Sequence, residues 1–155
     1  MASRRRPSGI SSTAASGVHR LPRALARAVP PGDGRAVSTT SDLGVHGERI
    51  AVAYLTDHGL RVLDRNWRCR EGELDIVARD GDALVFCEVK TRRGVGYGHP
   101  VEAVTHTKQR RLRTLAHRWL AAHDEHAPDL RFDVVGVLVR PSRPALVTHL
   151  RAAFL

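Results

Sequence analysis

The sequence predicts a single α/β domain in which a mixed β-sheet is flanked by helices, in the element order α-β-β-β-α-β-β. Apolar residues recur at helical spacing over about residues 42–58 and 100–123, while short apolar or alternating segments lie between and after these stretches. Helices interleaved with strands in this way are typical of α/β folds. The chain has 155 residues, 42% of them hydrophobic, which suffices for one core but not for a second domain of comparable size.

The first half of the pattern is a helix followed by a three-stranded meander. Ser41 or Asp42 can cap the helix, and Gly59 supplies a typical stop signal just after its end. Strands are expected where apolar residues run together or alternate, with Asp80-Gly81-Asp82 as the turn between the last two. The three expected strands are residues 60–64, 73–79 and 83–91.

The second half contains a loop, a long helix and two strands. Residues 92–99 hold three glycines and predict a flexible loop. Pro100 fits the first turn of a helix, which we expect to reach about His123. Residues 130–139 then predict a buried strand, and residues 144–149 a last strand at the edge of the sheet.

Residues 1–41 differ in composition from the domain that we expect over residues 42–155. They hold seven arginines and one acidic residue, so they carry +6 of the formal net charge of +9. They are also rich in Ser, Ala, Pro and Gly and show no strong apolar period, which predicts a disordered basic extension. Three readings stay open: a nucleic-acid-binding arm, a targeting segment, and an upstream extension from a misplaced start codon.

Cysteine content and hydropathy limit the cellular location. Cys69 and Cys87 are the only cysteines and stand 18 positions apart, so neither a disulfide framework nor a zinc motif is indicated. No apolar run approaches the roughly 20 residues that span a bilayer. We therefore expect a cytoplasmic protein with no membrane partner.

Charged side chains gather on the second and third expected strands. Residues two apart in a strand share a face, so Glu88 and Lys90 project together, as do Glu73 and Asp75. If the intervening turn closes the hairpin, Asp75 lies close to Glu88. Glu73 can instead be a structural residue paired with an arginine, and strand position favours Asp75 as the second carboxylate. Lys90 is one of only two lysines among 25 basic residues, and a lysine offers a compact charge with a tunable pKa.

This patch predicts metal-assisted hydrolysis of a phosphodiester. Opposed carboxylates repel each other unless a cation neutralises them, and Mg2+ or Mn2+ would do so with one or two carboxylates, water and phosphate as ligands. The metal would lower the pKa of a bound water, and Lys90 would orient or deprotonate that water. A salt bridge on a solvated sheet face is the alternative reading. Burial disfavours it, because charges within an apolar strand are costly unless they have partners or a task.

Four segments in order and at fitting spacing resemble the YraN-like uncharacterised bacterial family over about residues 42–140. The segments are residues 44–48, 66–77, 85–92 and 108–112. The family is identified as a member of the restriction-endonuclease-like superfamily and is similar to archaeal Holliday junction resolvases. The resemblance implies a nuclease core in which Asp75 and Glu88 bind the metal and Lys90 serves the attacking water. Glu48 on the first helix would be an auxiliary ligand or a group that contacts the ligands. Cys87 stands where a valine is usual in the family, and residues 1–41 have no counterpart.

Basic side chains near the patch predict a nucleic-acid partner. Lys108 near the start of the second helix, its neighbours Arg110 and Arg111, and the loop residues Arg92 and Arg93 are the candidate contacts. Solvated surface charge is the alternative for each of them. The expected substrate is structured or branched DNA, with RNA as a further option because no base-reading motif excludes it. A catalytically inactive nucleic-acid-binding or adaptor protein is the second functional class, and a two-fold DNA junction would favour a homodimer.

Overall fold

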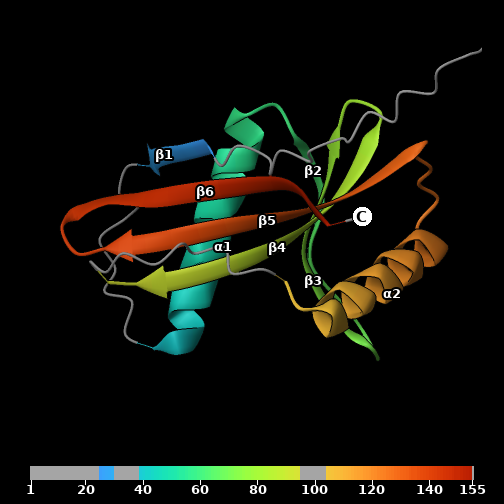
Figure 1. Ribbon diagram of the computed structural model, residues 1–155, viewed down its shortest axis with the longest axis horizontal. Helices are drawn as coiled ribbons and strands as arrows, with labels where there is room; N and C mark the ends of the chain where they lie inside the picture. The colour runs from blue at the N-terminus through green and yellow to red at the C-terminus, as the bar shows by residue number, and fades with distance from the viewer. Residues whose placement is uncertain (1–24, 30–38, 95–103, 155) are drawn as a thin grey trace, which may run out of the picture.

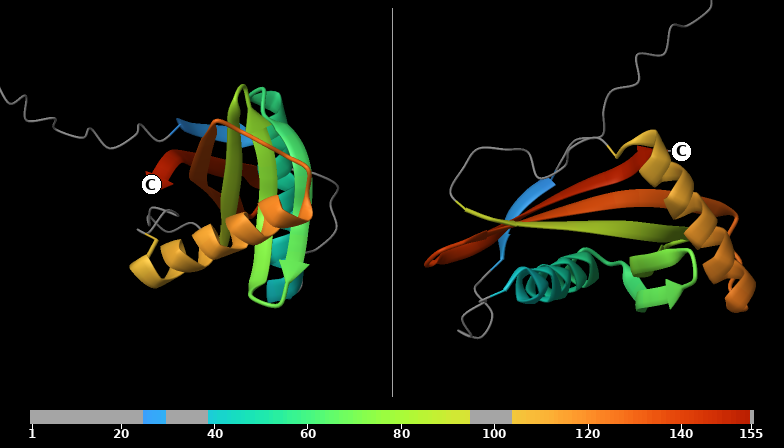
Figure 2. Two further views of the ribbon diagram at one scale, coloured as in Figure 1. Left: turned by 90° about the vertical axis from the view of Figure 1, so that its right-hand side faces the viewer. Right: turned by 90° about the horizontal axis from the view of Figure 1, so that it is seen from below.

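The computed structural model describes residues 25–29, 39–94 and 104–154 of the chain. Within these residues six strands form one mixed sheet in the order β1-β6-β5-β4-β3-β2. Every neighbouring pair of strands is antiparallel except β4 and β5, which are parallel. Helix α1 lies against one part of the sheet and α2 packs near its other end (Figures 1 and 2). The predicted mixed α/β fold is confirmed.

Helix α1 (Thr40–Asp57) begins at a capping box. The Thr39 hydroxyl accepts a hydrogen bond from the backbone N–H of Asp42 at 3.1 Å, and Asp42 Oδ2 accepts one from the backbone N–H of Thr39 at 3.1 Å. This reciprocal pair satisfies two helix N-terminal donors, so the helix begins slightly before the predicted cap at Ser41 or Asp42. It ends as predicted just before Gly59, whose φ of 85° suits glycine.

The predicted meander follows α1 as strands β2 (Arg61–Cys69), β3 (Gly72–Asp80) and β4 (Ala83–Arg93). All three strands are longer than predicted, β2 above all, because its pairing with β3 continues to the residue before the connecting turn. The β3–β4 register pairs Ile76 with Cys87. That register determines which side chains of the two strands lie level in the site described below.

Helix α2 (His106–Ala122) lies in the crossover between β4 and the parallel strand β5 (Asp129–Arg140). Its N-cap is Thr105, whose side chain accepts a hydrogen bond from the backbone N–H of Lys108 at 3.3 Å. The helix therefore begins later than the predicted start at Pro100, because a threonine cap satisfies a helix donor and proline only tolerates the lack of one. Pro100 itself lies outside the described residues.

Strand β6 (Arg143–Phe154) is longer than predicted and is not an edge strand. The segment Leu25–Val29 forms β1 and pairs antiparallel with β6. The expected disorder of residues 1–41 is therefore wrong for these five residues, because the open side of β6 offers backbone hydrogen bonds to an extended segment. Thr40 and Ser41 likewise belong to α1. Residues 1–24 and 30–38 of the basic extension lie outside the described residues.

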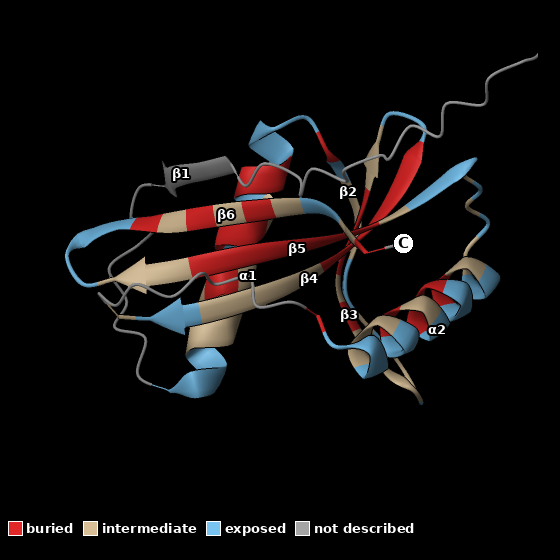
Figure 3. Ribbon diagram, viewed as in Figure 1, coloured by how far each residue is buried: buried red, intermediate tan, exposed pale blue. Residues whose placement is uncertain are grey.

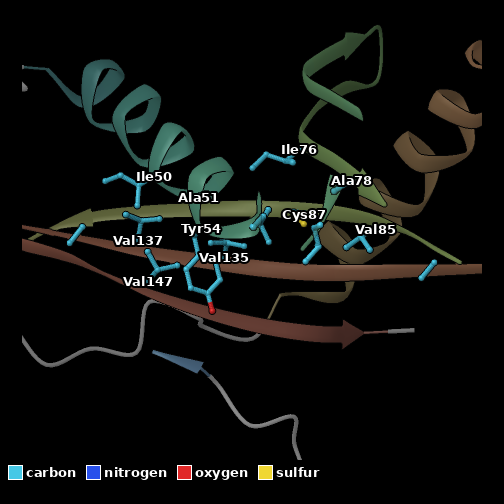
Figure 4. Close-up of a cluster of buried hydrophobic side chains, with 14 residues drawn as sticks. Ile50, Ala51, Tyr54, Ile76, Ala78, Val85, Cys87, Val135, Val137 and Val147 are labelled. Carbon is cyan, nitrogen blue, oxygen red and sulfur yellow. The ribbon is translucent and has the colours of Figure 1, made fainter. Parts of the chain in front are cut away.

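The hydrophobic core lies on both faces of the sheet, most densely along β4 and β5 (Figure 3). One cluster packs α1 residues such as Tyr54 against strand residues including Cys87 (Figure 4). The other packs α2 residues such as Trp119 against Phe86. Because successive strand residues alternate between faces, Glu88 follows Phe86 toward α2 rather than Cys87 toward α1.

Candidate functional site

A cleft of about 520 Å³ lies between the β2–β3 hairpin, β4 and the beginning of α2. Leucines of α2 form part of its wall, and the polar part is lined by side chains of both charge signs. The acidic residues are Glu73, Asp75 and Glu88, and the basic residues are Arg68, Lys108 and Arg111. The cleft therefore offers carboxylates for a cation beside cationic groups for an anion.

Asp75 on β3 lies level with Glu88 on β4, as the hairpin predicted. Asp75 precedes Ile76 and Glu88 follows Cys87, which are partners across the two strands. Asp75 Oδ2 accepts a hydrogen bond from the backbone N–H of Val89 at 2.7 Å. Burial and the nearby Glu88 carboxylate raise the pKa of Asp75 from its ordinary 3.8 to about 7. The surroundings of Asp75 therefore destabilise its ionised form relative to its protonated form.

Basic partners neutralise the other acidic side chains around the cleft. Three ion pairs do so: Lys108 with Glu88, Arg68 with Glu73 at 2.7 Å, and Arg118 with Glu71 at 2.8 Å. The pair at Glu73 fits the structural role that the sequence allowed for that residue. Among the described residues no basic side chain pairs with Asp75, whose hydrogen bond comes from the backbone amide of Val89. Asp75 is therefore the carboxylate of the cleft that most needs an added cation.

Asp133 on β5 is a fully buried carboxylate and offers a comparison, because basic side chains neutralise it. Its side chain lies 2.8 Å from His149 Nε2 and accepts hydrogen bonds from Arg131 Nε and the backbone N–H of Ala152, each at 2.9 Å. Burial acts to raise the pKa of Asp133, but the bonds from His149 and Arg131 outweigh it and lower the pKa below its ordinary value. The raised pKa of Asp75 therefore reflects missing partners and not burial alone.

Helix α1 approaches β4 closely at Gly47. A Cβ atom added there would lie 1.8 Å from Oγ1 of Thr91, so only glycine permits this contact. The next residue, Glu48, is near enough to Asp75 for its charge to raise the Asp75 pKa. Close packing of α1 on β4 therefore carries the Glu48 carboxylate toward the cleft.

The structure gathers some predicted site residues in the cleft and leaves others outside its lining. Asp75, Glu88 and Lys108 line it, whereas Lys90 and Glu48 do not. Lys90 is half-buried and stands two residues after Glu88 on β4. In the part of the chain that the structure describes, no hydrogen bond or ion pair engages the Lys90 ammonium.

The predicted nucleic-acid contacts divide in the same way. Arg111 lines the cleft, Arg110 is exposed beside it on α2, and Arg92 and Arg93 are exposed at the end of β4. Arg68 also lines the cleft and was not among the residues expected from the sequence. The signal that could have found it is the short turn after β2, which places Arg68 opposite Glu73 in the hairpin.

The carboxylates present fit a divalent cation in part. Among the described residues no three His, Cys, Asp or Glu side chains gather as a metal-ligand group, so Glu48 does not complete a triad with Asp75 and Glu88. Two adjacent carboxylates in an open cleft are nevertheless what Mg2+ requires, since water and phosphate oxygens supply its other ligands. A cation there would also offset the repulsion that raises the Asp75 pKa.

The fold and this cleft define a mixed α/β protein with paired carboxylates set between basic side chains. Comparison with known proteins gives its family: the chain belongs to the uncharacterised protein family UPF0102, whose model matches residues 47–137. A UPF0102 protein of Beutenbergia cavernae is 58% identical over 109 residues, which cover 70% of this chain and 92% of that protein. A UPF0102 protein of Nocardia farcinica is 53% identical over 112 residues, covering 72% of this chain and 88% of that one.

Neither of the two helices that the structure describes is both long enough and apolar enough to cross a bilayer.

Proposed function

We propose that this protein is a divalent-metal-dependent endonuclease that hydrolyses phosphodiester bonds in structured or branched DNA. The observation that carries the proposal is Asp75, a half-buried carboxylate beside Glu88 that lacks a basic partner among the described residues. A carboxylate pair of this kind is costly to ionise unless a cation binds it. Its place in a cleft lined by Arg68, Lys108 and Arg111 supports a phosphate-containing substrate.

In this proposal each residue of the site has a distinct task. Asp75 and Glu88 would hold Mg2+ or Mn2+, and Glu48 would hydrogen-bond the metal's water. When bound, the metal would polarise the phosphoryl oxygen and lower the pKa of a bound water. Lys90 would orient or deprotonate that water and stabilise charge that develops on the phosphate. The half-buried position of Lys90 near Glu88 supports this role.

The substrate would be held by basic side chains on two sides of the cleft. Lys108 and Arg111 on α2 and Arg68 on β2 line the cleft, and Arg92 and Arg93 at the exposed end of β4 would be further contacts outside its lining. We propose DNA in preference to RNA, and a homodimer if the substrate is a two-fold junction. A cytoplasmic location belongs to the same proposal, since two separate free cysteines suit a reducing compartment.

A nucleic-acid-binding protein without turnover is the second candidate. It is favoured by the ion pair between Lys108 and Glu88, which engages one of the two proposed metal ligands. Such a protein would bind DNA equally well with or without Mg2+ and would cut nothing.

The deciding experiment compares cleavage of branched, single-stranded and duplex DNA, and of RNA, with Mg2+ or Mn2+. Asp75→Asn keeps the size of the side chain and removes its charge, so we expect cleavage to fall at least about a hundredfold while binding persists. Asp82→Asn, an exposed change in the β3–β4 turn, is the matched control and should cut like the wild type. Equal traces of cutting by all three proteins would refute the catalytic proposal.

Lys90→Arg tests whether an ammonium is required and not merely a positive charge. The guanidinium of arginine stays protonated and is planar, so it can neither accept a proton nor present a compact charge in the same place. We expect cleavage to fall about a hundredfold or more with little change in DNA affinity. Full activity of Lys90→Arg would show that Lys90 contributes charge alone.

A further inference from the structure

Lys108 stands where an α-helix disfavours a positive charge. It lies in the first turn of α2, which holds no acidic residue, and the helix dipole makes that end electropositive. The Thr105 cap bonds the backbone N–H of Lys108 and leaves the ammonium to find its own partner. That partner is Glu88, so a long-range contact and not the helix itself accounts for a lysine at this position.

The Glu88–Lys108 ion pair joins two different elements at the edge of the cleft. The Glu88 side chain is 13% exposed and that of Lys108 is 39% exposed, so the carboxylate is fixed in the wall while the ammonium reaches in from solvent. Glu88 is also level with Asp75. A divalent cation between the two carboxylates would face the Lys108 ammonium at short range, and the two positive charges would oppose each other.

Arg111 lies one turn further along the same face of α2. Its guanidinium rests so closely on the backbone of Gly72 that an added Cβ would lie 2.4 Å from Arg111 Nη2. Arg111 is exposed and makes no ion pair within the described residues, whereas Lys108 is already paired with a carboxylate of the cleft. Of these two cations, Lys108 is therefore the one that a metal ion at Glu88 would displace.

We propose that Lys108 is a positioning residue that leaves Glu88 for a phosphate of the nucleic acid when a divalent cation binds Asp75 and Glu88. The inference rests on the proposed function for the two metal ligands and adds a coupling between metal and nucleic acid. The cation displaces Lys108 from Glu88, and the released ammonium then strengthens substrate binding. By thermodynamic linkage, bound nucleic acid strengthens cation binding by the same factor.

The first test measures Mn2+ affinity by calorimetry in the absence of nucleic acid. Lys108→Met keeps the length of the side chain and removes the opposing charge, so we expect Mn2+ to bind about five- to tenfold more tightly. Lys108→Gln is a second variant that should behave alike. Arg113→Met makes the same charge change on α2 at a residue that lies over the Phe154 ring and outside the cleft lining, so its Mn2+ affinity should stay within about twofold of wild type.

The second test measures the affinity for one branched DNA in Ca2+ and in EDTA. We expect Ca2+ to strengthen DNA binding by the wild type and Arg113→Met about fivefold, and Lys108→Met to lose most of this gain. An equal gain in Lys108→Met, or unchanged Mn2+ affinity in both Lys108 variants, overturns the coupling.

Asp75→Asn separates failure of the coupling from failure of the proposed function. If Asp75→Asn abolishes Mn2+ binding while the Lys108 variants bind like the wild type, the metal site stands and only the coupling fails. If the wild type does not bind Mn2+, or if Asp75→Asn binds it equally well, both proposals fail.

Discussion

The protonation state of Asp75 determines how much negative charge the cleft carries near neutral pH. Its carboxylate receives a backbone hydrogen bond from Val89, yet burial and the charge of Glu88 still raise its pKa to about 7. Near neutral pH the metal-free protein therefore holds Asp75 partly protonated. A bound cation would favour the ionised form, so metal binding should release protons and strengthen as the pH rises through 7.

The same pKa predicts how stability depends on pH without metal. The unfolded chain loses the Asp75 proton near pH 3.8 while the folded protein keeps it to about pH 7, so the folded state binds more protons over this interval. The Asp75 contribution to the free energy of unfolding should therefore fall as pH rises from about 4 to 7, by roughly 2 to 4 kcal/mol in total.

Urea unfolding in EDTA across this range would measure that contribution. Asp75→Asn should remove this part of the pH dependence and be more stable than the wild type at pH 8, whereas Asp82→Asn should follow the wild-type profile. Parallel profiles for the wild type and Asp75→Asn would contradict the raised pKa.

At the scale of elements, the packing of α1 on β4 depends on a missing side chain. Gly47 contacts Thr91, whereas Gly44, one turn earlier in the same helix, has no atom within 4 Å of the position a Cβ would take. The two glycines share a helix and differ in their surroundings. Comparing substitutions at the two glycines therefore distinguishes the effect of the close contact from the general cost of glycine in a helix.

Alanine substitution at these glycines should have opposite effects. Gly44→Ala removes a flexible residue and should stabilise the protein by up to about 1 kcal/mol. Gly47→Ala forces α1 away from β4 and should destabilise it by about 1 to 3 kcal/mol. Urea unfolding would compare them, and Thr91→Ala should recover part of the loss in the Gly47→Ala protein. Equal stabilisation by both changes would show that α1 moves away from β4 without cost.

How far the elements could be predicted depends on how local their signals are. The β3–β4 hairpin follows from its own turn, so the sequence alone placed Asp75 beside Glu88. The beginning of α2 was placed too early, because Pro100 and the cap at Thr105 are competing start signals and the pattern does not rank them. The Lys108–Glu88 contact could not be predicted, since it depends on how α2 packs after the chain has crossed the sheet.

The same limit applies to the sheet as a whole. Strand β6 was expected at an edge, but β1 pairs with it over residues 25–29, from Leu25 opposite His149 to Val29 opposite Ala145. Nothing in the composition of residues 1–41 marks a strand, because its stability comes from the open backbone of β6 and not from its own sequence. The pairing of β1 with β6 therefore depends on the backbone of both segments and could not be predicted from the side chains of residues 25–29.

Removing β1 should therefore loosen β6 and leave the cleft intact. In a variant that lacks residues 1–38 we expect amide hydrogen exchange within residues 145–149 to accelerate by roughly five- to tenfold, as each lost hydrogen bond stabilises the edge by about 1 kcal/mol. Exchange in β4 is the internal control and should not change. Unchanged exchange in residues 145–149 would show that β1 does not protect β6 in solution.

The parallel pairing of β4 with β5 also determines the order in which strands can pair during synthesis of the chain. Strands β2, β3 and β4 are joined by short turns and can associate early, whereas β5 joins β4 only after the α2 crossover, with Glu88 opposite Val134. The acidic wall of the cleft therefore forms before Lys108 arrives. We expect a nascent chain that ends before α2 to bring Asp75 and Glu88 together without the Lys108 ammonium that pairs with Glu88 in the folded protein.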